Sequence, residues 1–428
     1  MSTFVHKLGG SIIGNPRLLE NVIKSIRFDI ASTPNVLVVS ALNPSSDKST
    51  GTTSLLSSVR RTGSLHDKVE VVRTLHRNYG KVYEHFGLSI SDKTVSIIED
   101  ALFKGSNEET IEAGELASAQ MVSDILASKG VSVEQTRLPI TFKGRDVLFA
   151  NPVTRRGAIE TLRAECKTPS LTTVMPGFFH VGSNGTLKAI GRGYSDVTGA
   201  LAACIFSGKS YYVWKESGGV FTTHPGYYPK AKRVSSLSLN EARELTAFGN
   251  DVLHPLTSDF MMDMDIELAI KDADTNRACD TEVQITPMEY GKAAAPKITA
   301  IASRSRLCII DYKLAVPGAD LRFPFHPILL NVNRASVSAL LTEESYAFLP
   351  AKVPCNFTVR KNRSVIACVG RGLRGSIGVA SEITGTLAAE NINVEMLSQG
   401  PDEISVAIVV ATADERKAVK SLEARFMA

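Results

Sequence analysis

The stretch MPGFFHVGSNGTLKAIGRGYSDVTGALAACIFSGKSYYVWKESGGVFTTHPGYYP, residues 175–229, decides how this chain folds. It holds a glycine-rich turn over 182–193, an acid (Asp196) where a helical apolar pattern begins, and a short apolar strand over 211–214. Glycines let backbone N–H groups approach an anion, and the first turn of a helix offers unpaired N–H donors. The stretch therefore fits a phosphate or carboxylate site. It fits equally well a turn that only caps a helix, with Ser195 or Asp196 as the N-cap.

The composition is that of an ordinary protein of two or three domains, with 428 residues and 43% hydrophobic residues. The 48 basic and 44 acidic residues are evenly spread, which predicts neither a nucleic-acid partner nor a membrane partner. We expect no signal peptide, and no apolar run reaches the roughly 20 residues that a membrane-spanning helix needs. The six cysteines form no CxxC pair, which favours reduced core thiols and a cytoplasmic location.

The residues before this stretch show the pattern of an α/β layer fold. FVHKLGGS (4–11) is a strand that ends in a glycine turn, and an apolar helical stripe follows over 18–26. VLVVSA (36–41) is a continuous apolar run typical of a buried parallel strand. The polar loop over 43–53 leaves the end of that strand, where ligands collect in parallel sheets.

Further helices and strands are indicated on both sides of the central stretch. Helical periodicity occurs at residues 54–87, 93–129 (two helices), 157–166 and 239–255. Strand patterns occur at residues 138–142, 147–150, 171–175 and 266–274. We expect Glu115 in the first turn of its helix, where an acid favours the dipole, and Pro255 as a helix stop that leaves His254 at the helix end.

Beyond a predicted linker at 290–296 the pattern changes to a small α+β unit. Two similar strands, 298–310 and 364–370, suggest an internal repeat. The second is followed by a helix, two strands and a closing helix, a βαββα order. The first copy has three prolines within 315–329, which interrupt the helix expected there.

Five short motifs resemble those of the aspartate kinases in order and spacing. They are Lys7-Leu8-Gly9-Gly10-Ser11; Gly114-Glu115 with Ser118; Gly191-Arg192-Gly193-Tyr194-Ser195-Asp196; Val252-Leu253-His254-Pro255; and Asn391–Met396 with Ser398-Gln399-Gly400. The resemblance covers nearly the whole chain, and residues 51–56 and 214–216 are most similar to the fungal branch. It implies an α/β three-layer sandwich with a mainly parallel sheet over 1–290. Two ACT-type (ferredoxin-like) units follow, a degenerate one over 298–358 and a second over 364–428.

The resemblance also implies an activity. Aspartate kinases transfer the γ-phosphoryl of MgATP to the β-carboxylate of L-aspartate. The product, 4-phospho-L-aspartate, leads toward homoserine, threonine, methionine or a specialised metabolite. A carboxylate is already ionised at neutral pH, so no general base is required. ATP and Mg²⁺ are the implied cofactors, no protein metal ligand is assigned, and a homodimer through the ACT units is the implied assembly.

The family pattern assigns roles to individual residues. The implied catalytic residues are Lys7, Asp196 and Arg192, with Asp196 orienting Lys7. The implied substrate-binding residues are Glu115, Arg192, Thr53 and Ser40. The implied nucleotide- or phosphate-binding residues are Lys7, Gly9, Gly10, Ser11, Lys215, Glu216, Gly219, Phe221 and Lys230.

Departures from the pattern lie on the nucleotide side. The family's Asp-Pro-Arg is replaced by His224-Pro225-Gly226, and a further acid is replaced at Gly218. Each lost charge-assisted hydrogen bond could cost about 1.5–3 kcal/mol of ATP binding. Lys215, Lys230 and Lys232 are close enough in sequence to compensate. Two other functions therefore stay open: a kinase for another amino acid carboxylate, and a weakened paralogue that binds an amino acid and regulates a partner. The irregular first ACT unit leads to the hypothesis of reduced feedback inhibition.

Overall fold

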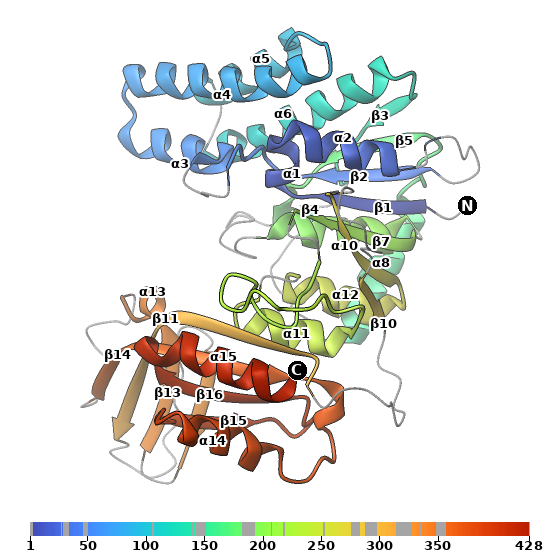
Figure 1. Ribbon diagram of the computed structural model, residues 1–428. Coiled ribbons are helices and arrows are strands. Elements are labelled where there is room, and N and C mark those ends of the chain that lie inside the picture. The colour runs from blue at the N-terminus through green and yellow to red at the C-terminus, as the bar shows by residue number, and fades with distance from the viewer. Residues whose placement is uncertain are drawn as a thin grey trace. The chain divides into compact units, whose positions relative to one another are not determined.

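The structure, a computed structural model, divides the chain into two compact units (Figure 1). One unit comprises residues 1–219 and 256–287, and the other comprises 220–255 and 288–428. The description below covers residues 3–26, 28, 34–45, 50–104, 107–138, 141–142, 151–181, 193–206, 208–216, 219–250, 253–274, 283–286, 298–313, 327–333, 336–347 and 357–427.

The first unit is built on a mainly parallel sheet in the order β3-β5-β2-β1-β7-β9-β10. All neighbours in this order are parallel except β10, which is antiparallel to β9. The strands are β1 (Thr3–Leu8), β2 (Asn35–Val39), β3 (Val133–Gln135), β5 (Thr172–Pro176), β7 (Gly208–Lys215), β9 (Glu267–Asp272) and β10 (Val283–Thr286). A separate parallel pair joins β4 (Thr141–Phe142) to β6 (His180–Val181). The carboxyl ends of the parallel strands therefore lie along one edge of the sheet, where loops can form a site.

Helices cover both faces of this sheet (Figure 1). They are α1 (Gly10–Gly14), α2 (Pro16–Ser25), α3 (Thr52–Thr62), α4 (Leu65–His85), α5 (Asp92–Phe103), α6 (Asn107–Ser128), α8 (Pro152–Glu165), α10 (Tyr194–Ile205) and α12 (Pro255–Met264). Leu8, Leu37 and Trp214 face the core shared with α1 to α6. Because side chains alternate along a strand, Lys7 points to the opposite face, where α10 packs. The expected α/β sandwich is confirmed.

The helical character expected for residues 54–87 is confirmed; the segment forms two helices, because Gly63 adopts a left-handed conformation (φ 63°) that ends α3. Two other local expectations from the sequence are wrong. Glu115 lies in the middle of α6, not in its first turn. The neighbouring Gly114 serves close packing, since a Cβ there would lie 2.8 Å from Thr52 Cγ2. Pro255 begins α12 where a stop was expected, because proline suits the first helical position; His254 thus precedes a helix.

The cap of α10 also differs from the expectation. Gly193 is the N-cap with φ 87°, a conformation that glycine adopts without steric cost, and no side chain caps the helix. Ser195 and Asp196 are therefore inside the first turn, where neither is needed as a cap. Their side chains are available for other contacts at the same helix end.

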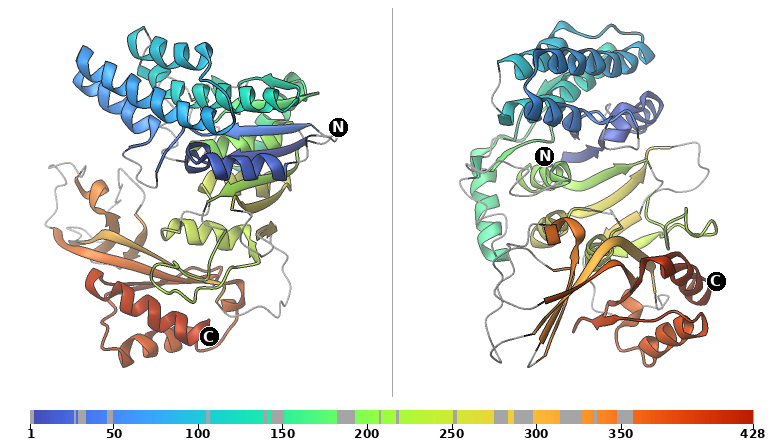
Figure 2. Two further views of the ribbon diagram at one scale, coloured as in Figure 1. Left: turned by 45° about the horizontal axis from the view of Figure 1, so that its top comes forward. Right: turned by 90° about the vertical axis from the view of Figure 1, so that its left-hand side faces the viewer.

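The second unit contains an antiparallel sheet in the order β12-β13-β11-β14-β16-β15 (Figure 2). Its strands are β11 (Ala300–Lys313), β12 (Leu329–Val332), β13 (Ser336–Thr342), β14 (Phe357–Val369), β15 (Met396–Gln399) and β16 (Ser405–Ala411). Its other elements are β8 (Ser236–Ser238), α11 (Leu239–Ala247), α13 (Glu343–Ala347), α14 (Val379–Ala389) and α15 (Glu415–Phe426). The predicted βαββα order of the second copy is confirmed, and pairing of β11 with β14 joins both copies in one sheet.

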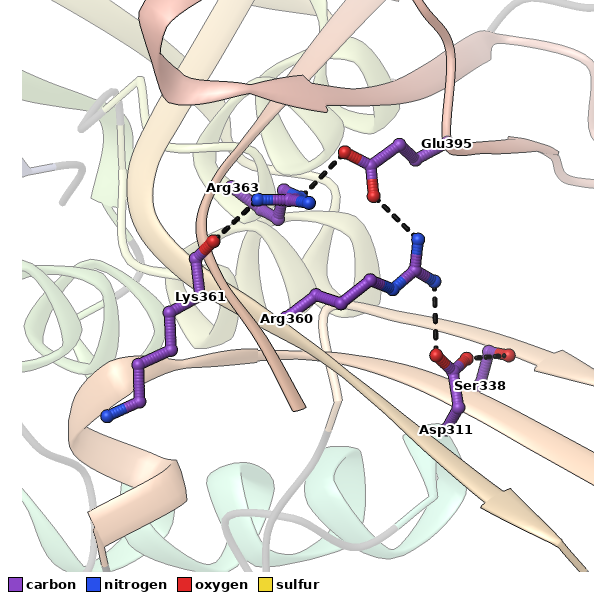
Figure 3. A network of polar contacts seen from close by, with 6 residues as sticks. All are labelled: Asp311, Ser338, Arg360, Lys361, Arg363 and Glu395. Carbon is purple, nitrogen blue, oxygen red and sulfur yellow. Dashed lines mark hydrogen bonds and ion pairs between the residues drawn. The ribbon is translucent and has the colours of Figure 1, made fainter. Parts of the chain in front are cut away.

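A network of polar and charged side chains connects the two ACT-type copies (Figure 3). Arg360 on β14 contacts Asp311 on β11 at 3.1 Å and Glu395 at 2.6 Å. Arg363 contacts the other oxygen of Glu395 at 2.7 Å, and Ser338 on β13 donates to Asp311 at 2.6 Å. The carboxylate of Glu395 is thus shared by two guanidinium groups, which fixes the first half of β14 against the segment before β15.

Other expectations have mixed outcomes. The thiols of Cys166, Cys204, Cys308 and Cys368 are free, and all but Cys166 are buried. Cys279, Cys355, the strand pattern at 147–150, the linker at 290–296 and most of the proline-containing segment lie outside the described residues. In the part of the chain that the structure describes, no helix is long and apolar enough to cross a membrane.

Candidate active site

A buried ion pair lies at the carboxyl edge of the first unit's sheet. Lys7 Nζ, next to the end of β1, is 2.7 Å from Asp196 Oδ1 in the first turn of α10, and both side chains are less than one-tenth exposed. The contact expected between these two residues is therefore present. Two charges are kept in a dry site only when each compensates the other, so removal of either leaves a costly buried charge.

The glycine turn after β1 packs against this pair. Lys7 Nζ lies 3.7 Å from the position that a Cβ on Gly9 would take, so the turn passes directly over the ammonium. A Cβ on Gly10 would collide with the carbonyl oxygen of Ala41, and Gly10 O accepts from the backbone N–H of Asn43 at 2.9 Å. The turn is thus held between two strand ends. Gly9, Gly10 and the half-buried Ser11 present backbone beside a cation, which suits a phosphate group.

Glu115 brings a second carboxyl into the first unit's site from α6. It is 2% exposed, and its Oε2 has no hydrogen-bond partner among the residues that the structure describes. Burial raises its pKa from 4.5 to about 8; hydrogen bonds from Tyr194 and the backbone of Ala41, and the charge of Lys7, oppose this, while Glu112 adds to it. A buried acceptor oxygen without a partner is costly, and a ligand ammonium would satisfy it.

Tyr194 was not singled out from the sequence as a site residue. Its ring is buried and packs edge-on against Phe178 at 5.6 Å between centroids. Its hydroxyl bonds Glu115, so one oxygen of that carboxyl is held while the other is left for a ligand. The residue occupies the variable position of the Gly191–Asp196 motif, which is why the motif alone did not identify it.

The loop after β2 adds hydroxyl and amide groups. Ser40 Oγ lies 2.8 Å from Ser195 Oγ on α10, so the end of β2 meets the first turn of α10 there. Thr53 is half-buried at the start of α3, which Thr52 ties to Leu42 O by a 2.8 Å hydrogen bond. Asn43 was missed by the sequence analysis. Its Oδ1 is buried without a hydrogen-bond partner in the described residues, and its position directly after a predicted strand was the available signal.

The predicted nucleotide residues divide between the two units. Lys215 ends β7, and Glu216 and Gly219 follow it in the first unit; Lys215 O accepts from Ala273 N at 2.9 Å. Phe221 and Lys230 belong to the second unit, as do His224 and Gly226. His224 Nδ1 accepts from Gly226 N at 3.1 Å, so the imidazole that replaces the family's acid is used to shape its own turn. Arg192, Gly191 and Gly218 lie outside the described residues.

His6 and the aromatic side chains near the site have structural roles. His6 is a buried strand residue whose ring contacts Asn35 Oδ1 at 3.1 Å and accepts from Trp214 Nε1 at 3.2 Å. Burial lowers its pKa to about 3, so it stays neutral and serves packing. Phe178, Phe179, Tyr211 and Trp214 are buried, whereas Tyr212 is half-buried.

Together these groups can hold a zwitterion and an anion side by side. Lys7 and the glycine turn suit a phosphoryl group, and Glu115 suits an ammonium. Among the described residues no group of three or more His, Cys, Asp or Glu side chains has the spacing to hold a metal ion. The first unit's site thus supplies positioned charge and hydrogen-bond donors, the kind of groups that phosphoryl transfer uses.

Comparison with known proteins matches this geometry to a family. Residues 2–272 match the sequence profile of the Amino acid kinase family, and residues 366–426 match that of an ACT domain. The aspartokinase of Candida albicans is 24% identical over 99% of this chain and 90% of that protein. The aspartokinase of Schizosaccharomyces pombe is 24% identical over 98% of this chain and 91% of that protein.

A solved structure shares the fold along the whole length. E. coli aspartokinase III in complex with aspartate and ADP superposes with a TM-score of 0.76 at 21% identity, covering 100% of both chains. That identity is low, so the likeness concerns the arrangement of the helices and strands.

Proposed function

This chain belongs to the amino acid kinase family, and we propose that it is an aspartate kinase, which transfers the γ-phosphoryl of ATP to the β-carboxylate of L-aspartate. The observation that carries the proposal is the Lys7–Asp196 ion pair under the Gly9 turn, together with Glu115 Oε2 in the same unit, which has no hydrogen-bond partner among the described residues. The fungal relatives named aspartokinase, matched over nearly their full length, support the same substrate.

Each group has a role that follows from its charge. Glu115, once ionised, accepts the substrate ammonium through Oε2, and Tyr194 holds its other oxygen. Lys7 neutralises charge on the transferring phosphoryl group, while Asp196 keeps the lysine aimed. We assign the α-carboxylate to Arg192 from the sequence pattern alone. A carboxylate oxygen of the substrate forms the new bond to phosphorus as the bond to the bridging oxygen of ADP breaks, so the site needs no base.

Mg²⁺ fits this site as a companion of ATP. The ion is commonly held by one or two carboxylates together with substrate phosphates and waters. Asp196 is the carboxylate on the phosphoryl side of the site, so it would hold the ion directly or through a water. The metal would supply neutralisation of phosphate charge. We also propose a cytoplasmic location, from the cysteine pattern.

We further propose that the protein assembles as a homodimer through the second unit. The strands at the two edges of its sheet, β12 and β15, carry partly exposed apolar side chains, among them Leu330, Val332 and Leu397. An exposed edge strand with apolar side chains is suited to pairing with another chain.

Two alternatives remain as outcomes of one experiment. Purified protein is incubated with ATP, Mg²⁺, hydroxylamine and L-aspartate, with L-glutamate in a parallel reaction and with a chelator as a further control. Aspartate-dependent hydroxamate supports the proposal, because hydroxylamine traps the acyl phosphate. Product only with another amino acid would indicate a kinase of different specificity. No product, with aspartate binding retained in calorimetry, would indicate a regulatory paralogue.

A further inference from the structure

The segment that carries the altered nucleotide motif belongs to one domain by sequence and to another by packing. The kinase-family match runs through residues 220–255. In the structure this segment is assigned to the compact unit that contains the antiparallel sheet and α15. In Figures 1 and 2 the yellow-green segment before α11 lies beside the red C-terminal helix.

Thr222 is the point at which this segment is anchored. Its Oγ1 donates to Glu423 Oε1 on α15 at 2.7 Å and accepts from Lys232 N at 3.1 Å. Its backbone N–H donates to Lys232 O at 2.8 Å, and its carbonyl accepts from Ile301 N on β11 at 2.6 Å. Thr222 thus pairs with Lys232 across the loop. It also connects the loop to α15 and β11 of the second unit.

Two more contacts join the same loop to α15. Arg416 lies over the ring of Tyr227 at 5.2 Å, and that ring packs against the apolar core beneath α14 and α15. Lys232 Nζ donates to the carbonyl of Met427 at 3.1 Å, just past the end of the helix. The loop is therefore held at its start, its middle and its end by the last helix of the fold.

Burying the carboxyl of Glu423 to contact Thr222 costs desolvation free energy. It is 1% exposed, and its Oε2 has no hydrogen-bond partner within the described part of the chain. Burial raises the pKa of this carboxyl. An apolar side chain at position 423 would leave only the hydroxyl of Thr222 without a partner, which costs less desolvation free energy than a buried carboxylate. Packing alone therefore does not explain the carboxylate.

We propose that α15 is the positioning element of the nucleotide loop, with Glu423 acting through Thr222 to hold Phe221 and Lys230 in the conformation that binds ATP. This inference rests on the proposed kinase activity and on the predicted nucleotide role of those two residues. We expect the C-terminal helix to affect the affinity for ATP. We expect no effect on the affinity for aspartate, because no contact of α15 described above involves Lys7, Glu115 or Tyr194.

The test separates ATP affinity from aspartate affinity. Thr222→Val keeps the shape of the side chain but removes its hydroxyl, and we expect about a tenfold rise in KM for ATP. KM for aspartate and kcat should stay within about twofold. Thr222→Ser keeps the hydroxyl and should restore the wild-type KM for ATP. ADP binding by calorimetry provides the same comparison without turnover.

Matched carboxylate variants provide the control. Glu423→Gln should raise KM for ATP, because the amide can no longer serve as a charged acceptor for Thr222. Glu244→Gln changes another carboxylate of the second unit, which accepts from Ser405 at 2.6 Å and is not among the contacts of the 220–234 loop given above. It should leave both KM values unchanged.

The outcomes distinguish this inference from the proposed function. A wild-type protein that forms no hydroxamate fails the proposed function. An active wild type whose ATP affinity survives Thr222→Val overturns the role of α15 alone. Equal rises in both KM values, together with a lowered melting temperature, would reduce Thr222 to a structural residue and overturn the inference as well.

Discussion

Replacement of Glu115 by glutamine should weaken aspartate binding and at the same time stabilise the protein. The carboxyl is buried, its Oε2 lacks a partner among the described residues, and its pKa is raised to about 8. At pH 7 only about one molecule in ten would therefore carry the ionised form in the absence of ligand. Glutamine matches the shape of the protonated acid but cannot gain a charge.

The expected effect on binding follows from that proton. If the substrate ammonium binds the ionised carboxyl, deprotonation costs about 1.4 kcal/mol at pH 7. The wild-type Kd for aspartate should fall about 50-fold between pH 6 and pH 8, with release of about one proton per aspartate at pH 7. Calorimetry in buffers of different ionisation enthalpy measures that proton. Glu115→Gln should bind weakly, with a Kd that does not vary over this range.

The expected effect on stability has the opposite sign. The folded pKa of about 8 lies above the unfolded value of 4.5, so the folded state binds the extra proton in this window. Stability is therefore lost as pH rises from 4.5 to 8, by about 3 kcal/mol at pH 7 and about 5 kcal/mol once Glu115 is fully ionised. Glu115→Gln escapes this loss. Denaturant unfolding should show a gain at pH 8 that nearly vanishes at pH 4.5.

The groups that face Glu115 define the control. Glu112 lies three residues earlier on α6 and contacts Arg137 at 3.0 Å, while Lys7 and Tyr194 face it from β1 and α10. Glu112→Gln should lose a little stability and keep the pH dependence of aspartate binding. A wild-type affinity that is flat from pH 6 to pH 8, or wild-type binding by Glu115→Gln, would refute the reasoning.

Three further predictions concern neighbouring groups. Lys7→Met should abolish hydroxamate formation and cost about 3–5 kcal/mol in denaturant unfolding, because the buried Asp196 carboxylate loses its ion-pair partner. Adding Asp196→Asn should recover stability without turnover, and recovered turnover would argue against a role in phosphoryl transfer. Tyr194→Phe should raise KM for aspartate several-fold with little change in kcat. It should also move the pH midpoint of aspartate binding upward, since the hydrogen bond from the Tyr194 hydroxyl favours the ionised form of Glu115. An unmoved midpoint would contradict this. Gly226→Arg combined with His224→Asp restores the family's charges and should lower KM for ATP about tenfold, whereas an unchanged KM would show that these positions do not face the nucleotide.

The elements were predictable where a local pattern determines them. The apolar run of β2 and the stripe of α2 have periodicities that only one type of element satisfies. Errors arose where one residue type serves two purposes. Gly114, beside the Glu115 expected in a first turn, lies inside α6 and permits close packing against Thr52 of α3, and Pro255, expected as a stop, begins α12. A glycine or proline marks a special backbone or packing requirement without saying which.

The candidate site was predictable in composition but not in contacts. Three site residues lie in recognisable motifs: Lys7 is suited to phosphate, Asp196 to a cation and Glu115 to an ammonium group. Tyr194 and Asn43 have no such signal, because their importance comes from which buried atoms they meet. The roles assigned to Arg192, and to the nucleotide residues after β7, stay predictions.

The sequence by itself determined the family, the order of helices and strands and the charged groups available, because periodicity and short motifs are properties of neighbouring residues. Only the tertiary structure decided that Lys7 and Asp196, 189 positions apart, form one ion pair and that Glu115 Oε2 is buried without a hydrogen-bond partner among the described residues. The tertiary structure likewise decided that the loop from Thr222 to Lys232 packs on α15. Such pairings depend on how distant segments pack and on which polar atoms burial leaves unsatisfied, and neither quantity is encoded in any single stretch of the chain.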